Sequence, residues 1–363
     1  MIAAIVFVAF VCAGKWIPVK YRGVCIYAVT LGLLYAVTAQ GLNVVGTDVA
    51  GELHTSREVA QHGWDLGLGD TNNTSWVVAW LVPVLGIQPE LVYKFVLPLA
   101  LAGVPVVLYM MFKRLVDDDK ALYSVMFFIS VPVMQAEIVM IGKSMVAELL
   151  MAVVFLLAMV GGNKWVKFTA MLVVGVIAAW AHYSIGFLLV MYLVCIGGYL
   201  LVRRNKDGVL YLAVGGVMAA SMWFYYNAVS GGQIVTIITD IARKMLFATG
   251  KFNGQISSPL HLLGIVLGAD FFTVGWLGKG FRVVQYATQA LVLLGSWLVV
   301  RSKMKDEYKA GVLVSLGVLV LCIAAPPFAS ILNVTRFYHV TLFFLAPTLV
   351  ISADWLYRKV KHV

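Results

Sequence analysis

The stretch ELVYKFVLPLALAGVPVVLYMMFKR, residues 90–114, decides the class of this protein. Between Leu91 and Phe112 its only charged residue is Lys94, and the stretch closes on two basic residues. About 20 apolar residues in a helix are enough to cross the hydrocarbon core of a bilayer. Runs of this kind recur along the 363-residue chain, which is 62% hydrophobic with a mean hydropathy of +0.93. We therefore predict an all-α, polytopic transmembrane helical bundle, formed as a single domain over residues 1–363.

Short clusters of Lys and Arg separate the apolar runs and indicate how the chain is oriented. Loops that carry Lys and Arg tend to stay on the cytoplasmic side of a membrane. A net charge of +10 would suggest a nucleic-acid partner for a soluble protein, but here it fits this bias. We therefore expect membrane lipids and no nucleic acid as partners, and a multi-pass protein of the plasma membrane. The four cysteines lie in apolar segments without metal-ligand spacing, so they predict neither disulfides nor a metal centre.

The apolar runs are bounded alternately by basic clusters and by segments without them, and this alternation predicts about eleven spans of the usual length. A short first span falls within residues 1–13. Two external regions stand out: residues 41–89 form the first external loop, and residues 230–282 form a second region. Residues 121–141 and 144–161 are predicted to form a hairpin of two spans with an external turn.

The first external loop contains a polar island, VVGTDVAGELHTSREVAQHGWDLGLGD at residues 44–70. Seven acidic, basic or histidine residues crowd into eighteen of its positions, in a chain that is 12% charged overall. At 3.6 residues per turn, Val49 and Leu53 share one helix face, and Asp48 and Glu52 lie side by side on the next face. Such a helix lies along the membrane surface and holds both carboxylates over whatever the spans enclose.

Asp48 and Glu52 are therefore the first candidates for chemistry. We predict Asp48 as a catalytic base, with Glu52 either positioning it or binding a divalent metal ion with it, Mg²⁺ or Mn²⁺. The alternative is a solvated polar face on an interfacial helix. His54 and Arg57 are further candidates on the same helix. Residues 76–87 are apolar but too short to span, so they predict a second interfacial helix in this loop.

Lys143 stands on the external turn of the predicted hairpin, against the positive-inside trend, and Glu148 follows it in an apolar span. A charge at bilayer depth costs ~2.5–3.5 kcal/mol on insertion scales, so such groups usually pair or face a cavity. Lys143 is therefore either a phosphate-binding residue or one partner of an ion pair with Glu137 or Glu148. His182 and Tyr183 lie at the external end of another hairpin, where a helix-to-helix hydrogen bond is the alternative to a catalytic role.

Arg336, Tyr338 and His339, in NVTRFYHVTLFF, are predicted to lie at or just outside the last span, residues 339–357. A guanidinium beside an aromatic ring and a histidine suits two-point binding of a phosphate. The alternative is an interfacial anchor formed by Arg and Tyr.

Several stretches resemble the GT-C glycosyltransferases, multi-span membrane enzymes that use sugars linked to lipid phosphates. These stretches are GTDVAGE (46–52), IGKSMVAELLMA (141–152), WAHYSIGFL (180–188), WFYYNAVSG (223–231) and LNVTRFYHVTLFFLAP (332–347). In order and spacing they are most similar to a family of archaeal polytopic membrane proteins grouped with those enzymes. The resemblance samples most of the chain from about residue 40 to 350.

The resemblance implies inverting transfer of a sugar from a polyprenyl-phosphate donor to a glycan, lipid or protein acceptor on the extracytoplasmic side. Asp48 would deprotonate the acceptor hydroxyl. Lys143, Arg336 and His339 would neutralise the charge on the departing phosphate. Two other classes use similar charges: a transporter or flippase for lipid-linked or anionic substrates, and a polysaccharide polymerase or ligase. A transporter places its charges near the midplane on broken helices, whereas a polymerase would rely on external Arg and His more than on an Asp/Glu pair.

Overall fold

The computed structural model describes residues 17–41, 43–62, 76–229, 235–236, 239, 243, 275–324 and 334–361. Within these residues the regular secondary structure is helical throughout. The chain divides into two compact units, Met1–Ile234 and Val235–Val363, and each unit is described by itself.

Nine helices among the described residues are long and apolar enough to cross a membrane, and a bent helix pair raises the number to ten. The predicted all-α, polytopic helical bundle is therefore confirmed. The bent pair joins Asp118–Ser130 to Val133–Met140 at 55°. Pro132 explains the bend because the residue before a proline is driven to extended backbone, and Val131 has φ −74° and ψ 123°. The short span predicted within residues 1–13 lies outside the described part.

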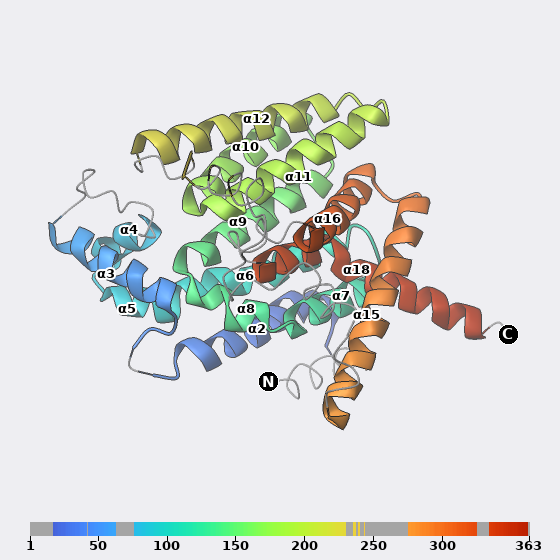
Figure 1. Cartoon of the computed structure of the whole chain (residues 1–363), viewed down its shortest axis with the longest axis horizontal. Helices are drawn as coiled ribbons and strands as arrows, with labels where there is room; N and C mark the ends of the chain where they lie inside the picture. Colours follow the sequence, from blue (N-terminus) through green and yellow to red (C-terminus); the bar gives the residue numbers. More distant parts are fainter. Residues whose placement is uncertain are drawn as a thin grey trace. The chain divides into compact units, whose positions relative to one another are not determined.

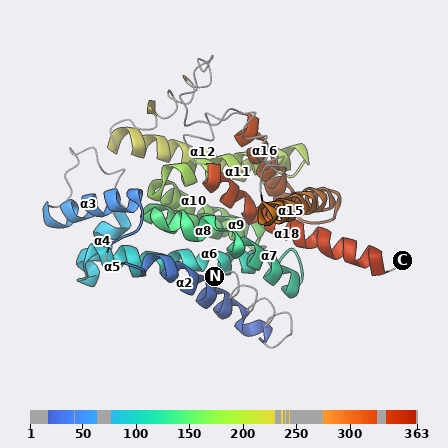
Figure 2. The ribbon, with the colours of Figure 1, turned by 60° about the horizontal axis from the view of Figure 1, so that its bottom comes forward.

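Unit 1 contains all the helices up to residue 229 (Figure 1). They are η1 (Val19–Tyr21), α2 (Arg22–Thr38), α3 (Thr47–His62), α4 (Trp76–Leu85), α5 (Pro89–Leu91), η4 (Val92–Val96), α6 (Leu97–Phe112), α7 (Asp118–Ser130), α8 (Val133–Ala136), η5 (Ile138–Met140), α9 (Gly142–Met159), α10 (Lys164–Ala181), α11 (Tyr183–Val202), α12 (Gly208–Phe224) and η6 (Tyr225–Val229). α9 packs against α6, α10 and α11, so it is central to this unit. α3 and α4 lie together beside α5 (Figures 1 and 2).

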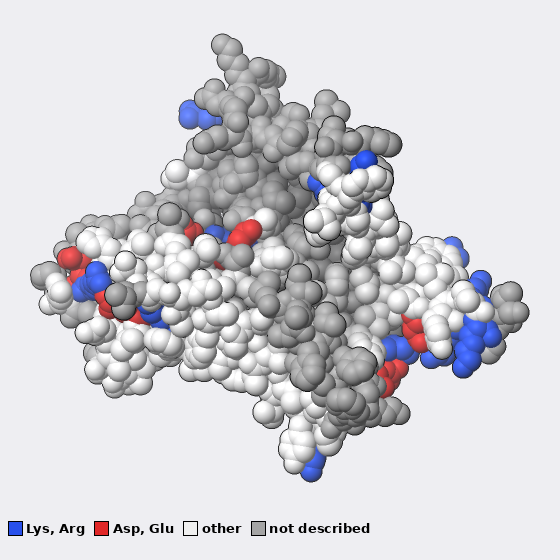
Figure 3. Space-filling view, turned by 90° about the horizontal axis from the view of Figure 1, so that it is seen from below, with Lys and Arg blue, Asp and Glu red and all other residues white. Residues whose placement is uncertain are grey.

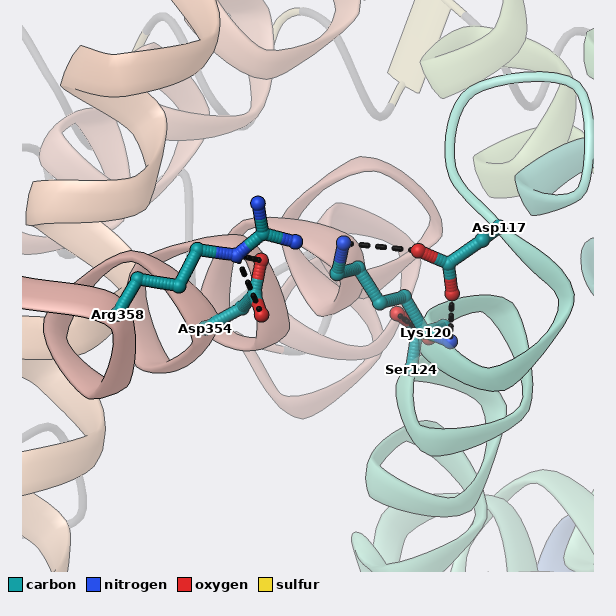
Figure 4. Close-up of polar contacts among 5 residues, drawn as sticks. All are labelled: Asp117, Lys120, Ser124, Asp354 and Arg358. Carbon is teal, nitrogen blue, oxygen red and sulfur yellow. Dashed lines mark hydrogen bonds and ion pairs between the residues drawn. The ribbon is translucent and has the colours of Figure 1, made fainter. Parts of the chain in front are cut away.

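The start of α7 shows how polar side chains define the ends of the spans (Figure 4). The Asp117 carboxylate accepts the Lys120 backbone N–H at 2.9 Å and pairs with Lys120 Nζ at 2.8 Å. The Ser124 hydroxyl donates to the Lys120 carbonyl at 2.7 Å. A capping carboxylate satisfies an N–H that has no partner within the helix, and Asn163 caps the start of α10 in the same way.

Side chains of α2 donate hydrogen bonds to backbone carbonyls near the start of the next span. Pro98 has no N–H, so the Lys94 carbonyl lacks the donor that lies four residues further along in an ordinary helix. The Thr38 hydroxyl donates to this carbonyl at 2.9 Å, and the Tyr35 hydroxyl donates to the Phe95 carbonyl at 2.9 Å. These bonds fix the end of α2 against η4 and α6, immediately before residues 41–89, the predicted first external loop.

Glycines allow the later helices of unit 1 to approach closely. A Cβ placed on Gly197 of α11 would lie 2.9 Å from the Gly208 carbonyl oxygen at the start of α12. A Cβ on Gly175 of α10 would lie 2.6 Å from Met218 Sδ on α12. Small residues are typical of such contacts in membranes, where close backbone packing replaces the hydrophobic driving force.

Unit 2 contributes three long helices to the described part: α15 (Trp276–Arg301), α16 (Asp306–Ala324) and α18 (Val334–Lys361). α18 packs against both of the others. Gly311 of α16 lies under the Phe344 ring, and Gly295 of α15 lies against the Thr348 carbonyl, so a side chain at either position would clash. In unit 2, as in unit 1, glycines at the helix contacts therefore allow close packing.

Two helices of unit 2 begin earlier than predicted. α15 starts at Trp276, so residues 276–282 of the predicted external region belong to a 26-residue helix. α18 starts at Val334, so Arg336 and Tyr338, which are predicted just outside the last span, lie in its first turns together with His339, the first residue of the predicted span. Hydropathy locates the hydrocarbon core, whereas a helix rising ~1.5 Å per residue continues past a ~30 Å core until the chain breaks it. Most of residues 230–275 lies outside the described part.

The surface agrees with a membrane environment. Figure 3 shows broad uncharged surfaces with Lys, Arg, Asp and Glu gathered in separate groups. Val194 and Val217 of unit 1 are 41% and 51% exposed, and Leu293 of unit 2 is 60% exposed. Apolar side chains along a spanning helix face lipid rather than water. Charged residues instead mark helix ends, as in the Asp354–Arg358 pair near the end of α18, 3.1 Å between Oδ2 and Nε (Figure 4).

Candidate functional site

α3 carries the predicted catalytic carboxylates, and one of its faces packs against the rest of unit 1. Val49, Glu52, Leu53 and Ser56 are all buried, with the i, i+3, i+4, i+7 spacing of a single helix face. Asp48 is exposed in the first turn. The sequence placed Asp48 and Glu52 side by side on one face, but the structure turns Glu52 inward and leaves Asp48 outside.

The buried Glu52 carboxylate lies at the amino end of α9. Ile141 is extended, with φ −141° and ψ 97°, and α9 begins at Gly142. The N–H of Lys143 donates to Glu52 Oε2 at 3.2 Å, and the N–H of Gly142 adds a second hydrogen bond. The first N–H groups of a helix have no partner within it and carry partial positive charge, so they attract anions. We call Gly142, Lys143 and Ser144 the α9 N-terminal site.

Only glycine fits at the first position of this site. A Cβ on Gly142 would lie 2.6 Å from Glu52 Oε2 and closer still to the Tyr93 ring. The Tyr93 hydroxyl in turn shares a hydrogen bond of 3.0 Å with the Ser56 hydroxyl. Tyr93 belongs to η4, a single π-helical turn, and such turns occur frequently at functional sites. A ring from η4 and the first turn of α9 thus border the Glu52 carboxylate.

Two further contacts hold α3 in place. Gly46, which precedes α3, has φ +112°, and a Cβ there would lie 2.6 Å from Met140 Cβ in η5. Near the other end of α3, Arg57 pairs with Glu90. The Arg57 side chain is half exposed, so this ion pair contributes at most ~1 kcal/mol. The close packing at Gly46 and the buried face therefore fix α3 more firmly than the surface pair does.

The electrostatics of this cluster centre on Glu52. Burial raises the pKa of Glu52 from 4.5 to about 7, against the lowering effect of the Lys143 charge and the two backbone N–H groups. The Asp48 carboxylate raises the pKa of Glu52 further. Burial dominates because removing a carboxylate from water penalises its charged form. Glu52 therefore changes its protonation near neutral pH, where catalytic acids and bases operate.

These surroundings fit a metal ion poorly. Within the described part of the chain, no group of three His, Cys, Asp or Glu side chains comes together as a set of metal ligands. The Glu52 carboxylate already accepts N–H groups at a positive helix end and lies within the field of Lys143. A divalent cation would be repelled by that helix end and by the lysine. This geometry does not favour the predicted Mg²⁺ or Mn²⁺ at Asp48 and Glu52, which stays a prediction.

The other candidates of unit 1 lie in different surroundings. His54 is exposed on α3. His182 is 1% exposed and caps α11, where its Nδ1 accepts the Ser184 N–H at 3.1 Å and contacts the Ser184 hydroxyl at 2.9 Å. The Tyr183 ring stacks on the His182 ring, with 5.2 Å between the centroids. These contacts favour the structural interpretation of His182. Glu148 is fully buried in α9, one turn beyond Ser144.

The candidates of unit 2 lie in the first turns of α18. Arg336 is partly buried, and Tyr338 is 36% exposed. His339 is fully buried with its ring edge-on to Phe343, 6.1 Å between the centroids. They belong to a different compact unit from α3 and α9. A joint phosphate site formed with Lys143 stays a prediction.

Sequence reasoning missed three residues of the cluster, namely Tyr93, Ser56 and Ser144. Tyr93 lies in what reads as an ordinary span, and no sequence signal marks the π-turn that contains it. Ser56 and Ser144 are small polar residues, and the charged residues beside them in the sequence are stronger candidates by composition alone. The run Gly142-Lys143-Ser144 did carry a signal, because a glycine, a lysine and a hydroxyl at a helix start are the groups that cradle phosphates.

No protein-family model matches the chain, and the comparison with curated proteins gives no match either.

Proposed function

We propose that this chain is a membrane glycosyltransferase of the GT-C type. It takes a sugar from a polyprenyl-phosphate donor and transfers it to a glycan, lipid or protein acceptor, on the outer side of the plasma membrane. The observation that carries the proposal is the contact between α3 and α9. Glu52 on α3 meets Lys143, 91 residues along the chain, and so brings the exposed Asp48 to a site with a lysine and a helix amino end.

In the proposed reaction Asp48 acts as the general base. Its carboxylate takes the proton of an acceptor hydroxyl, and the oxygen forms a bond to the anomeric carbon from the face opposite the phosphate. The bond between that carbon and the phosphate oxygen breaks, and its electron pair leaves with the phosphate. The anomeric configuration is inverted as a result. Asp48 suits this role because its carboxylate is exposed to an incoming acceptor.

Lys143 and the amino end of α9 would stabilise the charge that grows on the departing phosphate. A cation and oriented N–H groups that are already in place need no reorganisation during the reaction. Arg336 and His339 remain further candidates for this role on α18. Glu52 acts as a positioning residue, because its contact with α9 fixes the helix that carries Asp48.

A transporter or flippase is the second candidate, and one observation favours it. The span that begins with α7 is bent by 55° after Ser130, and Glu137 follows the bend. Broken spans of this kind line the substrate sites of transporters. The glycosyltransferase is the better supported of the two because Asp48 lies on an exposed helix that is not itself a span, rather than on a broken one.

The decisive experiment compares Asp48→Asn with Glu58→Gln, a matched carboxylate-to-amide change on the same helix. Cells that carry each variant in place of the native chain are analysed by mass spectrometry for lipid-linked sugars and surface glycans. Loss of a general base lowers transfer by ~10²–10⁴-fold. We expect Asp48→Asn to accumulate the unused donor and to lack the glycan, while Glu58→Gln resembles the native protein. Near-normal glycan in Asp48→Asn, with donor movement across the membrane impaired instead, would favour the transporter.

A further inference from the structure

The α9 N-terminal site has more binding capacity than one carboxylate uses. The first turn of this 18-residue helix offers N–H groups of Gly142 and Lys143, and next to them the Lys143 ammonium and the Ser144 hydroxyl. The missing Cβ at Gly142 lets a ligand approach the backbone. These four features are the ones that bind a phosphate group at a helix start.

In this structure the ligand of the site is part of the chain itself. Glu52 Oε2 accepts the Lys143 N–H at 3.2 Å, and Glu52 is only 2% exposed. A carboxylate in this position is an anion of the same sign as a phosphate but with fewer oxygens. Glu52 therefore shows that the site accepts the oxygen of a carboxyl group, and it also covers the site.

Two buried polar atoms indicate that the carboxylate is an imperfect occupant. The Ser144 hydroxyl is fully buried, and within the described part of the chain it has no hydrogen-bond partner. The same holds for Glu52 Oε1, the second carboxylate oxygen. A buried polar atom without a partner costs free energy, because it has lost its bonds to water. A phosphate monoester carries three free oxygens and so can engage donors that a carboxylate leaves unused.

The attachment of α3 is suited to exchange. Of its described apolar side chains, only Val49 and Leu53 are buried. The Arg57–Glu90 pair is exposed, and the buried Glu52 carboxylate is itself costly to desolvate. An incoming phosphate therefore competes with a helix that is held by two buried apolar side chains, the Ser56–Tyr93 hydrogen bond and the packing of Gly46.

We infer that the α9 N-terminal site binds a phosphate monoester, and that Glu52 closes this site until the phosphate displaces it and moves α3. The inference rests on the proposed function for the source of the phosphate, the lipid monophosphate that leaves when the sugar is transferred. Asp48 lies one turn before Glu52 on the same helix, so binding of this product shifts the base at the same time. The exchange thus couples the position of the base to the presence of the released lipid phosphate.

The test measures binding of a short-chain isoprenyl monophosphate to the purified full-length protein in detergent. Removing the competing carboxylate should tighten binding, so we expect Glu52→Ala to lower the Kd at least tenfold. Glu58→Ala removes one carboxylate from the same helix away from the site and should leave the Kd within twofold. Adding Lys143→Met to Glu52→Ala should weaken binding at least tenfold, and adding Ser144→Ala should weaken it severalfold.

Two further ligands identify the chemical group that is recognised. The matching isoprenol, which lacks phosphate, should bind all variants equally. Competition by inorganic phosphate would assign recognition to the phosphate alone, whereas binding of only the isoprenyl monophosphate would assign it to the lipid headgroup. Both results support the site. Glu52→Ala binding no tighter than the native protein, or a gain that isoprenol shares, would overturn it.

Movement of α3 is measured separately, in case Glu52→Ala does not fold. A cysteine placed at buried Ser56 of α3, in a background without the native cysteines, should react faster with a thiol reagent when isoprenyl monophosphate is added. A cysteine at exposed His54 should react at the same rate with or without it. An unchanged rate at Ser56 would refute the exchange.

The outcomes separate this inference from the proposed function because the ligand carries no sugar. If the native protein transfers sugar but Glu52→Ala gains no phosphate affinity, the inference fails and the function stands. If Glu52→Ala gains affinity but no sugar transfer is found, the function fails and the phosphate site stands.

Discussion

Replacing the buried Glu52 by Gln should stabilise the protein against unfolding, and this gain over the native protein should be larger at high pH than at low pH. The change keeps the size of the side chain and removes its charge. Glu52 has its pKa raised from 4.5 to about 7, mainly by burial. A raised pKa in a folded acid means that folding favours the protonated form, so the native protein loses stability as pH rises from 4.5 to 7. Above that range the loss is constant.

The size of the effect follows from the shift. Between 4.5 and about 7 there are roughly 2.5 units, and each unit corresponds to ~1.4 kcal/mol, which gives about 3 kcal/mol. Glu52→Gln should therefore exceed the native protein by less than about 1 kcal/mol at pH 5 and by up to about 3 kcal/mol at pH 8. In a chain of this length that corresponds to a rise in Tm on the order of 5 °C.

The assay is thermal unfolding in mild detergent, followed by tryptophan fluorescence between pH 5 and pH 8.5. Glu58→Gln, on the same helix but only half-buried, controls for the loss of one negative charge and should show no comparable trend with pH. A difference between Glu52→Gln and the native protein that stays flat with pH would refute the reasoning. A difference that grows toward low pH would also do so, because it would mean that the carboxylate is favoured in its charged form.

Four other outcomes are expected. A cysteine at His54 on α3 should react with a membrane-impermeant thiol reagent added outside the cell and one at Asp118 should not, and the reverse labelling would overturn the orientation. Arg336→Lys should lower donor affinity or turnover roughly ten- to a hundredfold if the guanidinium binds phosphate, because lysine lacks the planar two-point fork; free substitution with unchanged donor binding would make Arg336 an anchor. His182→Ala should lower the free energy of unfolding by about 1 kcal/mol for a lost helix cap, measured as a lower Tm, without a change in transfer by the folded protein, and a selective loss of transfer would give His182 a catalytic role. Chelation by EDTA should leave transfer unchanged, because the carboxylates of α3 lie beside a positive helix end, and inactivation that added Mg²⁺ restores would contradict this.

The residues of α3 show where sequence reasoning worked and where it stopped. The helix itself was predicted from the density of charge and the spacing of Val49 and Leu53. The sequence pattern places Glu52 on a polar face of the helix, because a hydropathy scale counts every carboxylate as exposed to water. The structure buries it instead. What turns Glu52 inward is the amino end of α9, where N–H groups compensate the charge.

α18 shows a second limit. The apolar run of its last span was clear in the sequence, but its first turns were not, so Arg336 and His339 were expected at its outer edge. Hydropathy reports where lipid begins, whereas the helix continues into polar sequence until the backbone is interrupted.

The sequence by itself determined that this is a helical membrane protein of many spans. A bilayer requires long apolar segments whose backbone polar groups are satisfied internally, and that requirement can be read residue by residue. Only the tertiary structure decided that Glu52, Tyr93 and Gly142 meet. Their contact depends on a π-turn in one helix, a missing Cβ in another and the burial of a charge, and these properties arise only when α3, η4 and α9 pack together.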